Sequence, residues 1–151
     1  RGVADRIGWV LGDGVRLPFP DATFDAVTSG FLLRNVPDLD LALVEMARVA
    51  RPGGRVVALE FTPDSAAWWR PVFEIAFGRV APWLGEVVAG NRDAYVYLPA
   101  SVSGFVGVGQ VAEAMRRAGL VPLVARRRLL GSVAVHRAVK PARSGVGVGP
   151  G

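Results

Sequence analysis

The chain has 151 residues, of which 51% are apolar, and it carries a formal charge of +5. This length can bury one core, although it is short for a complete nucleotide-fold enzyme. The absence of Cys excludes disulfides and cysteine metal sites, and a single His excludes a multi-histidine metal site. The apolar runs are far shorter than the roughly 20 residues that cross a bilayer, so we expect no transmembrane helix.

Two apolar runs open the chain and are separated by prolines. Ile7 to Leu11 predicts a buried strand, and Phe24 to Phe31 predicts a second one. Pro18 and Pro20 continue neither strand, since each proline removes a backbone donor and fixes its own φ. The first residue is Arg and no secretory leader follows it, so we expect a cut N-terminus rather than a processed one.

A helix and a third strand follow. Apolar residues recur at helical spacing from Leu39 to Ala50, with Asp38 placed to cap the start and Pro52-Gly53-Gly54 placed to end the helix. Arg55 to Phe61 then predicts a strand. This alternation of strand, helix and strand indicates a parallel sheet with crossover helices.

The second half of the chain has a different character. Ala66 to Ala89 is apolar and aromatic but interrupted by prolines, which predicts two or three kinked helices. Val108 to Ala118 predicts another helix. Leu120 to Leu130 and Ser132 to Lys140 predict two strands, which we expect to be antiparallel. The tail, residues 141–151, is rich in Gly and Val with little to bury it, so we expect it to be disordered.

Five short motifs occur in a fixed order along the first half of the chain. They are Gly12-Asp13-Gly14, Leu17-Pro18-Phe19-Pro20-Asp21, Phe24-Asp25, Leu33-Arg34-Asn35-Val36 and Arg51-Pro52-Gly53-Gly54. Together they resemble the second half of a class I S-adenosylmethionine-dependent methyltransferase. The Leu33-Arg34-Asn35-Val36 element narrows the resemblance to the menaquinone and ubiquinone biosynthesis C-methyltransferases. The similarity covers about Gly12 to Lys140.

The resemblance implies an α/β, Rossmann-like class I methyltransferase fold. It would be incomplete at the N-terminal side, with the first two strands missing, and would end in an antiparallel strand pair. Residues 1–140 would form this partial domain, followed by the 141–151 tail. Without the two strands, the strand from Ile7 to Leu11 would lack a hydrogen-bonded neighbour. We therefore expect residues 1–20 to be poorly anchored and Phe24 to Lys140 to be compact.

Ligands of an open parallel sheet bind outside the carboxyl ends of its strands. Several chemically useful residues are predicted to share that rim, namely Asp13, Gly30, Arg34, Glu60 and Phe61. In the resemblance, Asp13 and Gly14 bind the adenine of S-adenosylmethionine, the carboxylate accepting from the exocyclic amine. The alternative is an Asp capping a turn beside a flexible Gly.

This rim also departs from the family at two positions. The family has Ser-Phe-Gly-Leu-Arg-Asn where this chain has Gly30-Phe31-Leu32-Leu33-Arg34-Asn35. Gly30 takes the cofactor-binding place without the hydroxyl, and Leu32 adds bulk. These departures bear on cofactor affinity and on the choice of quinone.

Arg34 and Asn35 are the candidate catalytic residues implied by the resemblance. Methylation of a hydroquinone ring carbon needs electron density from a phenolate oxygen, and a fixed guanidinium lowers the pKa of that phenol and holds its charge. Asn35 can donate or accept beside it. The alternative is a surface Arg34 paired with Asp38 or Asp40 and an Asn in a turn.

Weaker candidates lie later in the chain. Tyr95 and Tyr97 could relay a proton, although buried tyrosines more often pack. His136 falls inside the last predicted strand as a partly exposed residue and is a weak candidate base. The Trp-rich stretch from Trp68 to Trp83 is either core or the cover of a polyprenyl pocket.

The sequence and the resemblance therefore predict a methyltransferase that transfers the methyl group of S-adenosylmethionine to a polyprenyl quinol of the demethylmenaquinol type. We expect the reaction to need no metal, and we expect this fragment alone to be inactive. Methylation of another small molecule and a non-catalytic binding module are the alternatives. We expect no nucleic-acid partner, and we expect the protein to be located in the cytoplasm. Peripheral contact with the inner face of the membrane and assembly into a homo-oligomer are both left open.

Overall fold

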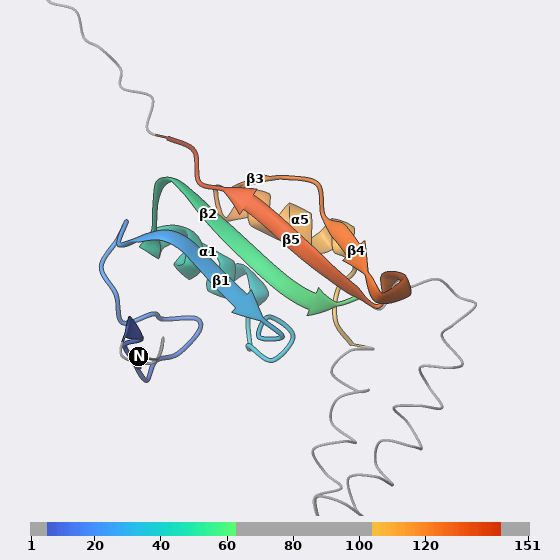
Figure 1. The fold of residues 1–151 in the computed structure, drawn as a ribbon, viewed down its shortest axis with the longest axis horizontal. Coiled ribbons are helices and arrows are strands. Elements are labelled where there is room, and N and C mark those ends of the chain that lie inside the picture. The colour runs from blue at the N-terminus through green and yellow to red at the C-terminus, as the bar shows by residue number, and fades with distance from the viewer. Residues whose placement is uncertain (1–5, 63–103, 143–151) are drawn as a thin grey trace, which may run out of the picture.

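The computed structural model describes residues 6–62 and 104–142 (Figure 1). The elements in these ranges are β1 (Phe24–Gly30), α1 (Leu39–Val49), β2 (Ala50–Phe61), α5 (Val108–Arg117), β3 (Val121–Pro122), β4 (Arg126–Arg128), the 3₁₀ turn η4 (Leu129–Gly131) and β5 (Val133–Val139). The kinked helices predicted over Ala66 to Ala89, Tyr95 and Tyr97, and the tail lie outside the described residues.

The strands form one mixed sheet in the order β1-β2-β5-β3, with β4 also paired to β5. β1 and β2 are parallel, and α1 connects them as a crossover helix. β5 runs antiparallel to β2, and both β3 and β4 run antiparallel to β5. Figure 1 shows α1 and α5 behind the sheet, on the same face. The parallel pair and the antiparallel C-terminal strands are therefore confirmed.

Local signals in the sequence explain where α1 begins and where α5 ends. The Asp38 side chain accepts from the Leu41 backbone N–H at 3.0 Å and so satisfies one of the free donors at the start of α1. α5 ends before Gly119, whose φ of +77° suits a residue without a Cβ. No helix in the described ranges is long and apolar enough to cross a membrane.

The core lies between the sheet and the two helices. Val56 and Ala58 of β2 alternate toward the helices, and Ala138 of β5 stands opposite Val56. They pack with buried helix and loop residues, namely Leu33, Ala42, Leu43, Met46, Ala47, Ala50, Val111, Ala114, Met115 and Leu120. The alternation in β2 therefore decides which of its side chains face α1 and α5.

Two predicted element boundaries are wrong. β2 begins at Ala50, directly after α1, and not at Arg55, because Gly53 and Gly54 exchange backbone hydrogen bonds with Lys140 and continue the pairing across a bulge. The single strand predicted over Leu120 to Leu130 is divided into β3 and β4, both paired to β5.

The strand predicted over Ile7 to Leu11 is absent. Trp9 is 89% exposed and Leu11 is fully exposed, and neither residue belongs to a strand. An apolar run forms a strand only with a neighbour to bond, and no described strand lies beside this segment. β1 is likewise half-exposed rather than buried, since it is the edge of the described sheet.

Poor anchoring was predicted for all of residues 1–20, but the later part of this segment is held in place. Arg48 of α1 donates to the backbone oxygens of Leu17 and Phe19 at 3.0 and 2.8 Å, and Glu45 accepts from the Leu17 N–H at 2.8 Å. The hydrogen bond from Arg48 also holds the pKa of Glu45 below its ordinary value. Leu17 and Phe19 are therefore anchored to α1, and Val15 also packs against the core.

His136 is buried, not partly exposed as predicted. Its side chain is 2% exposed because β5 turns it toward the helix-covered face, opposite Ala58. Nδ1 has no hydrogen-bond partner in the described ranges. Burial lowers the pKa of His136 below its ordinary value, so this residue is neutral in the folded protein at neutral pH.

The folded protein should lose stability as the pH falls through the ordinary histidine pKa. Above about pH 6.5, His136 is neutral in both states and stability is full; below it, only the unfolded chain takes up the proton, so the free energy of unfolding decreases, by at most about 1.4 kcal/mol per pH unit. Urea unfolding between about pH 8 and 5.5 measures this slope. The variant His136→Leu should remove most of it, and an unchanged slope in that variant would contradict the prediction.

Candidate functional site

The candidate site lies where β1 and β2 end side by side. Gly30 stands opposite Leu59 in the parallel register, and the N–H of Phe31 donates to the Leu59 oxygen at 2.8 Å. The chain then turns sharply, with Phe31 at φ +55°. This geometry places the loop from residue 31 to residue 36 against the last residues of β2, at the rim predicted from the sequence.

Arg34 is held inside this rim. Its side chain is only 9% exposed, and Nη1 donates to Oε2 of Glu60 at 3.0 Å. Its guanidinium carbon lies 5.3 Å from the ring centres of both Phe31 and Phe61, within cation–π range. Nε is buried and has no hydrogen-bond partner among the described residues. A fixed cation with an unused donor is suited to hold an oxyanion.

The structure contradicts the alternative of a surface Arg34 paired with Asp38 or Asp40. Asp38 caps α1, and Asp40 pairs with Arg117 of α5 at 2.7 Å. Asn35 has a role within the loop, since its Nδ2 donates to the Phe31 oxygen at 2.9 Å and its backbone N–H donates to the Leu32 oxygen at 2.8 Å. Asn35 therefore helps to shape the turn that carries Arg34.

Asp13 and Gly14 lie on a turn that touches this loop. Oδ1 of Asp13 accepts from the Val15 N–H at 3.0 Å, and the side chain is exposed. A Cβ added to Gly14 would lie 3.3 Å from Val36 and 3.6 Å from Leu32. The missing Cβ at Gly14 therefore lets this turn pack closely on the Arg34 loop, a contact that the sequence did not indicate.

Gly30 differs from Gly14 in its surroundings. A Cβ added there would meet no atom within 4 Å, and its φ lies outside the left-handed region. The backbone and the neighbouring atoms therefore leave room for a small polar side chain at this position.

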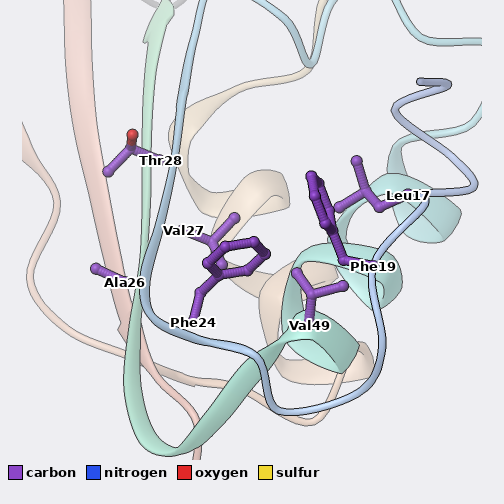
Figure 2. A pocket seen from close by; sticks show the side chains of 7 residues that line it. All are labelled: Leu17, Phe19, Phe24, Ala26, Val27, Thr28 and Val49. Atoms are coloured by element: carbon purple, nitrogen blue, oxygen red, sulfur yellow. The ribbon is translucent and has the colours of Figure 1, made fainter. Parts of the chain in front are cut away.

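A hollow in the described surface lies at the opposite end of the strands. Its lining is almost entirely apolar and comes from Leu17, Phe19, Phe24, Ala26, Val27, Thr28 and Val49. Figure 2 shows Phe19, Phe24 and Val49 pointing toward one another. β1 begins at Phe24 and ends at Gly30, so this hollow lies away from Arg34. Its lining also lacks charged groups, so we do not assign the chemistry to it.

Comparison with known proteins assigns the chain to a family. The profile of the ubiE/COQ5 methyltransferase family matches residues 1–140. This chain belongs to the ubiE/COQ5 methyltransferase family. It is 44% identical over 142 residues to a demethylmenaquinone methyltransferase of Mycolicibacterium paratuberculosis, and 48% identical over 108 residues to one of Deinococcus radiodurans.

These alignments cover most of the chain but only part of each relative. They include 94% and 72% of this chain, and the chain spans 62% and 45% of the two relatives. A solved S-adenosylmethionine-dependent methyltransferase of Thermotoga maritima, described as a possible histamine N-methyltransferase, has a TM-score of 0.60 at 19% identity, covering 91% of this chain and 66% of that one. This likeness supports the Rossmann-like class I methyltransferase fold.

The ubiE/COQ5 motifs located the rim but not the partner of Arg34. Glu60 was placed at the same rim without a role, because 26 residues separate it from Arg34 and no local pattern joins them. The role of Glu60 could nonetheless have been inferred, since a carboxylate on the buried face of a strand needs a cationic or N–H partner. The packing of Phe31 and Phe61, with ring centres 4.8 Å apart, carried no sequence signal.

Proposed function

We propose that the protein encoded by the complete reading frame containing this chain, called here the full-frame protein, methylates a ring carbon of demethylmenaquinol or a related polyprenyl quinol. The observation that carries the proposal is the buried guanidinium of Arg34 at the rim of the sheet, whose Nε has no partner within residues 6–62 and 104–142. Family membership and the names of the relatives support the substrate class.

Arg34 would act on the oxygen of the quinol. Its positive charge favours the phenolate over the phenol and stabilises the charge that the oxygen carries before the ring carbon reacts. S-adenosylmethionine, when bound, would supply its sulfonium methyl group as the electrophile, with the thioether as the leaving group and the ring proton released to water. Positioning and electrostatics account for the contribution of this chain.

The described residues fit one end of the cofactor. The exposed Asp13 carboxylate can accept from the exocyclic amine of adenine, with Gly14 beside it. The open space next to Gly30 is compatible with a ligand or a side chain at the end of β1. We propose that Asp13, Gly14 and Gly30 contact the cofactor, that Arg34 and Asn35 face the quinol, and that the protein works in the cytoplasm with peripheral membrane contact.

A serine at position 30 should tighten cofactor binding. Gly30→Ser restores the hydroxyl that the family carries, and the structure has space for its Cβ. The expected gain is about 0.5–1.5 kcal/mol, the net worth of one ordinary hydrogen bond. Calorimetric titration of the full-frame protein with S-adenosylmethionine measures it, with Gly30→Ala as the control for the methylene alone. Weaker binding of the serine variant would show that the pocket is built around glycine.

A methyl-transfer assay with several acceptors tests the proposed function. Transfer to demethylmenaquinol, detected by mass, supports it. Transfer only to unrelated small acceptors would assign a different substrate, a result that the bulk of Leu32 in the Arg34 loop could produce. No transfer to any acceptor by a folded protein that binds the cofactor would favour a non-catalytic module.

A further inference from the structure

Glu60 is a fully buried carboxylate, with 0% exposure, and both of its oxygens are used. Oε1 accepts from the backbone N–H of Leu33 at 2.7 Å, and Oε2 accepts from Nη1 of Arg34 at 3.0 Å. A buried charge is strongly unfavourable unless it is paired and hydrogen-bonded. Glu60 therefore holds two consecutive residues of the loop that follows β1.

The two hydrogen bonds have different consequences. The bond to Leu33 fixes the loop backbone just after the left-handed Phe31, and the side chain of Leu33 is buried in the core. The bond to Arg34 fixes the rotation of the guanidinium, because it occupies Nη1 while the rings of Phe31 and Phe61 lie beside the group. The orientation that results leaves Nε without a partner in the part of the chain that the structure describes.

We propose that Glu60 is a positioning residue that aims Nε of Arg34 at the quinol oxygen. This inference rests on the proposed function, because that function requires the guanidinium of Arg34 and the inference makes Glu60 the residue that orients it. Glu60 acts only through Arg34. Misplacement of a catalytic group by about 1 Å is enough to lower a rate roughly 100-fold, so orientation of the guanidinium has a measurable effect.

Replacement of Glu60 by glutamine separates the two bonds. The side-chain oxygen of Gln can still accept from the Leu33 N–H, but its amide N–H₂ would face the Nη1–H of Arg34, donor against donor. In the full-frame protein, Glu60→Gln should lower kcat about 10- to 100-fold, while the dissociation constant of S-adenosylmethionine changes by less than about two-fold.

The matched control is Asp40→Asn, which also neutralises a carboxylate paired with an arginine. Its partner Arg117 is exposed and belongs to α5, so the effect on kcat should stay within about two-fold. A loss in Asp40→Asn as large as that in Glu60→Gln would overturn the proposal, because the loss would then follow from charge removal in general.

A double-mutant cycle distinguishes the positioning role from the proposed function. Arg34→Ala should lower kcat strongly in the wild-type background and much less in the Glu60→Gln background, because Glu60 acts through Arg34. Fully additive losses would overturn the positioning role. Unchanged kcat in Arg34→Ala would instead overturn the proposed role of Arg34, and a loss in Arg34→Ala without one in Glu60→Gln would overturn the positioning role alone.

NMR of the 151-residue chain gives a readout that needs no turnover. The Nε–H of Arg34 should exchange slowly with solvent in the wild type, because the guanidinium is buried and held. In Glu60→Gln this exchange should become faster while the Leu33 amide stays protected. Rapid exchange of Nε–H in the wild type would overturn the proposal. If Glu60→Gln does not fold, two results decide the question. They are the exchange rate of the Arg34 Nε–H in the wild type, and the same rate in Glu60→Asp, whose side chain is too short to reach both partners.

Discussion

Replacement of Arg34 by alanine should lower the turnover of the full-frame protein by roughly 100-fold or more, with little change in affinity for S-adenosylmethionine. The reason is that we propose Arg34 as the group that stabilises the phenolate, and Asp13, Gly14 and Gly30 as the cofactor contacts. Steady-state kinetics with saturating quinol, together with calorimetry for the cofactor, measures both effects.

Two further variants sharpen this test. Arg34→Lys should restore only part of the rate, since an ammonium is a point charge and cannot bond Glu60 and a ligand through one planar group. Arg34→Ala leaves Glu60 buried without its cation, which destabilises a protein by about 3–5 kcal/mol, so folding must be checked by circular dichroism. The double variant Arg34→Ala/Glu60→Gln removes that charge. Normal turnover in a folded Arg34→Ala variant would refute the role of Arg34.

Replacement of Gly54 by alanine should destabilise the chain by about 1–3 kcal/mol. An added Cβ would lie 2.7 Å from the Arg51 oxygen and 3.1 Å from the Asp25 oxygen, and both are backbone atoms that cannot rotate away. The bulge at the start of β2 would have to open, which weakens its pairing with β1. Urea unfolding of the 151-residue chain measures the change.

Gly109→Ala is the matched control for Gly54→Ala. It makes the same chemical change in α5, where an added Cβ meets no atom within 4 Å. Alanine is the better helix former, so this variant should gain roughly 0.5–1 kcal/mol. If the two substitutions changed stability equally, the close approach at Gly54 would not exist in solution.

The features predictable from the sequence are those with local causes. The Asp38 cap and the glycine after α5 each act over a few residues, and both appear in the structure. The Arg34 loop was found because its motif is short and contiguous. The family pattern therefore located the rim without showing how it is built.

The features that could not be predicted depend on what lies beside a segment in space. The apolar run at Ile7 to Leu11 has the composition of a strand, but the described sheet offers it no neighbour. The alternation of residues around His136 indicates a strand, but it does not indicate which face of the sheet the His136 side chain lies on. Burial of that side chain depends on how β5 pairs with β2. The contact between Arg34 and Glu60 likewise exists only after β1 and β2 are aligned.

The pairing of β2 with β5 has a consequence for synthesis on the ribosome. Residues from Arg55 to Phe61 bond to residues from Val139 to Val133, so the central pair of the sheet joins two segments that are far apart in the sequence. Until β5 leaves the ribosome, β2 keeps an unpaired edge and Val56 and Ala58 lack the β5 side of their core. The nascent chain therefore exposes an unpaired strand edge while the residues between β2 and β5 are being made, the period in which a chaperone is most useful.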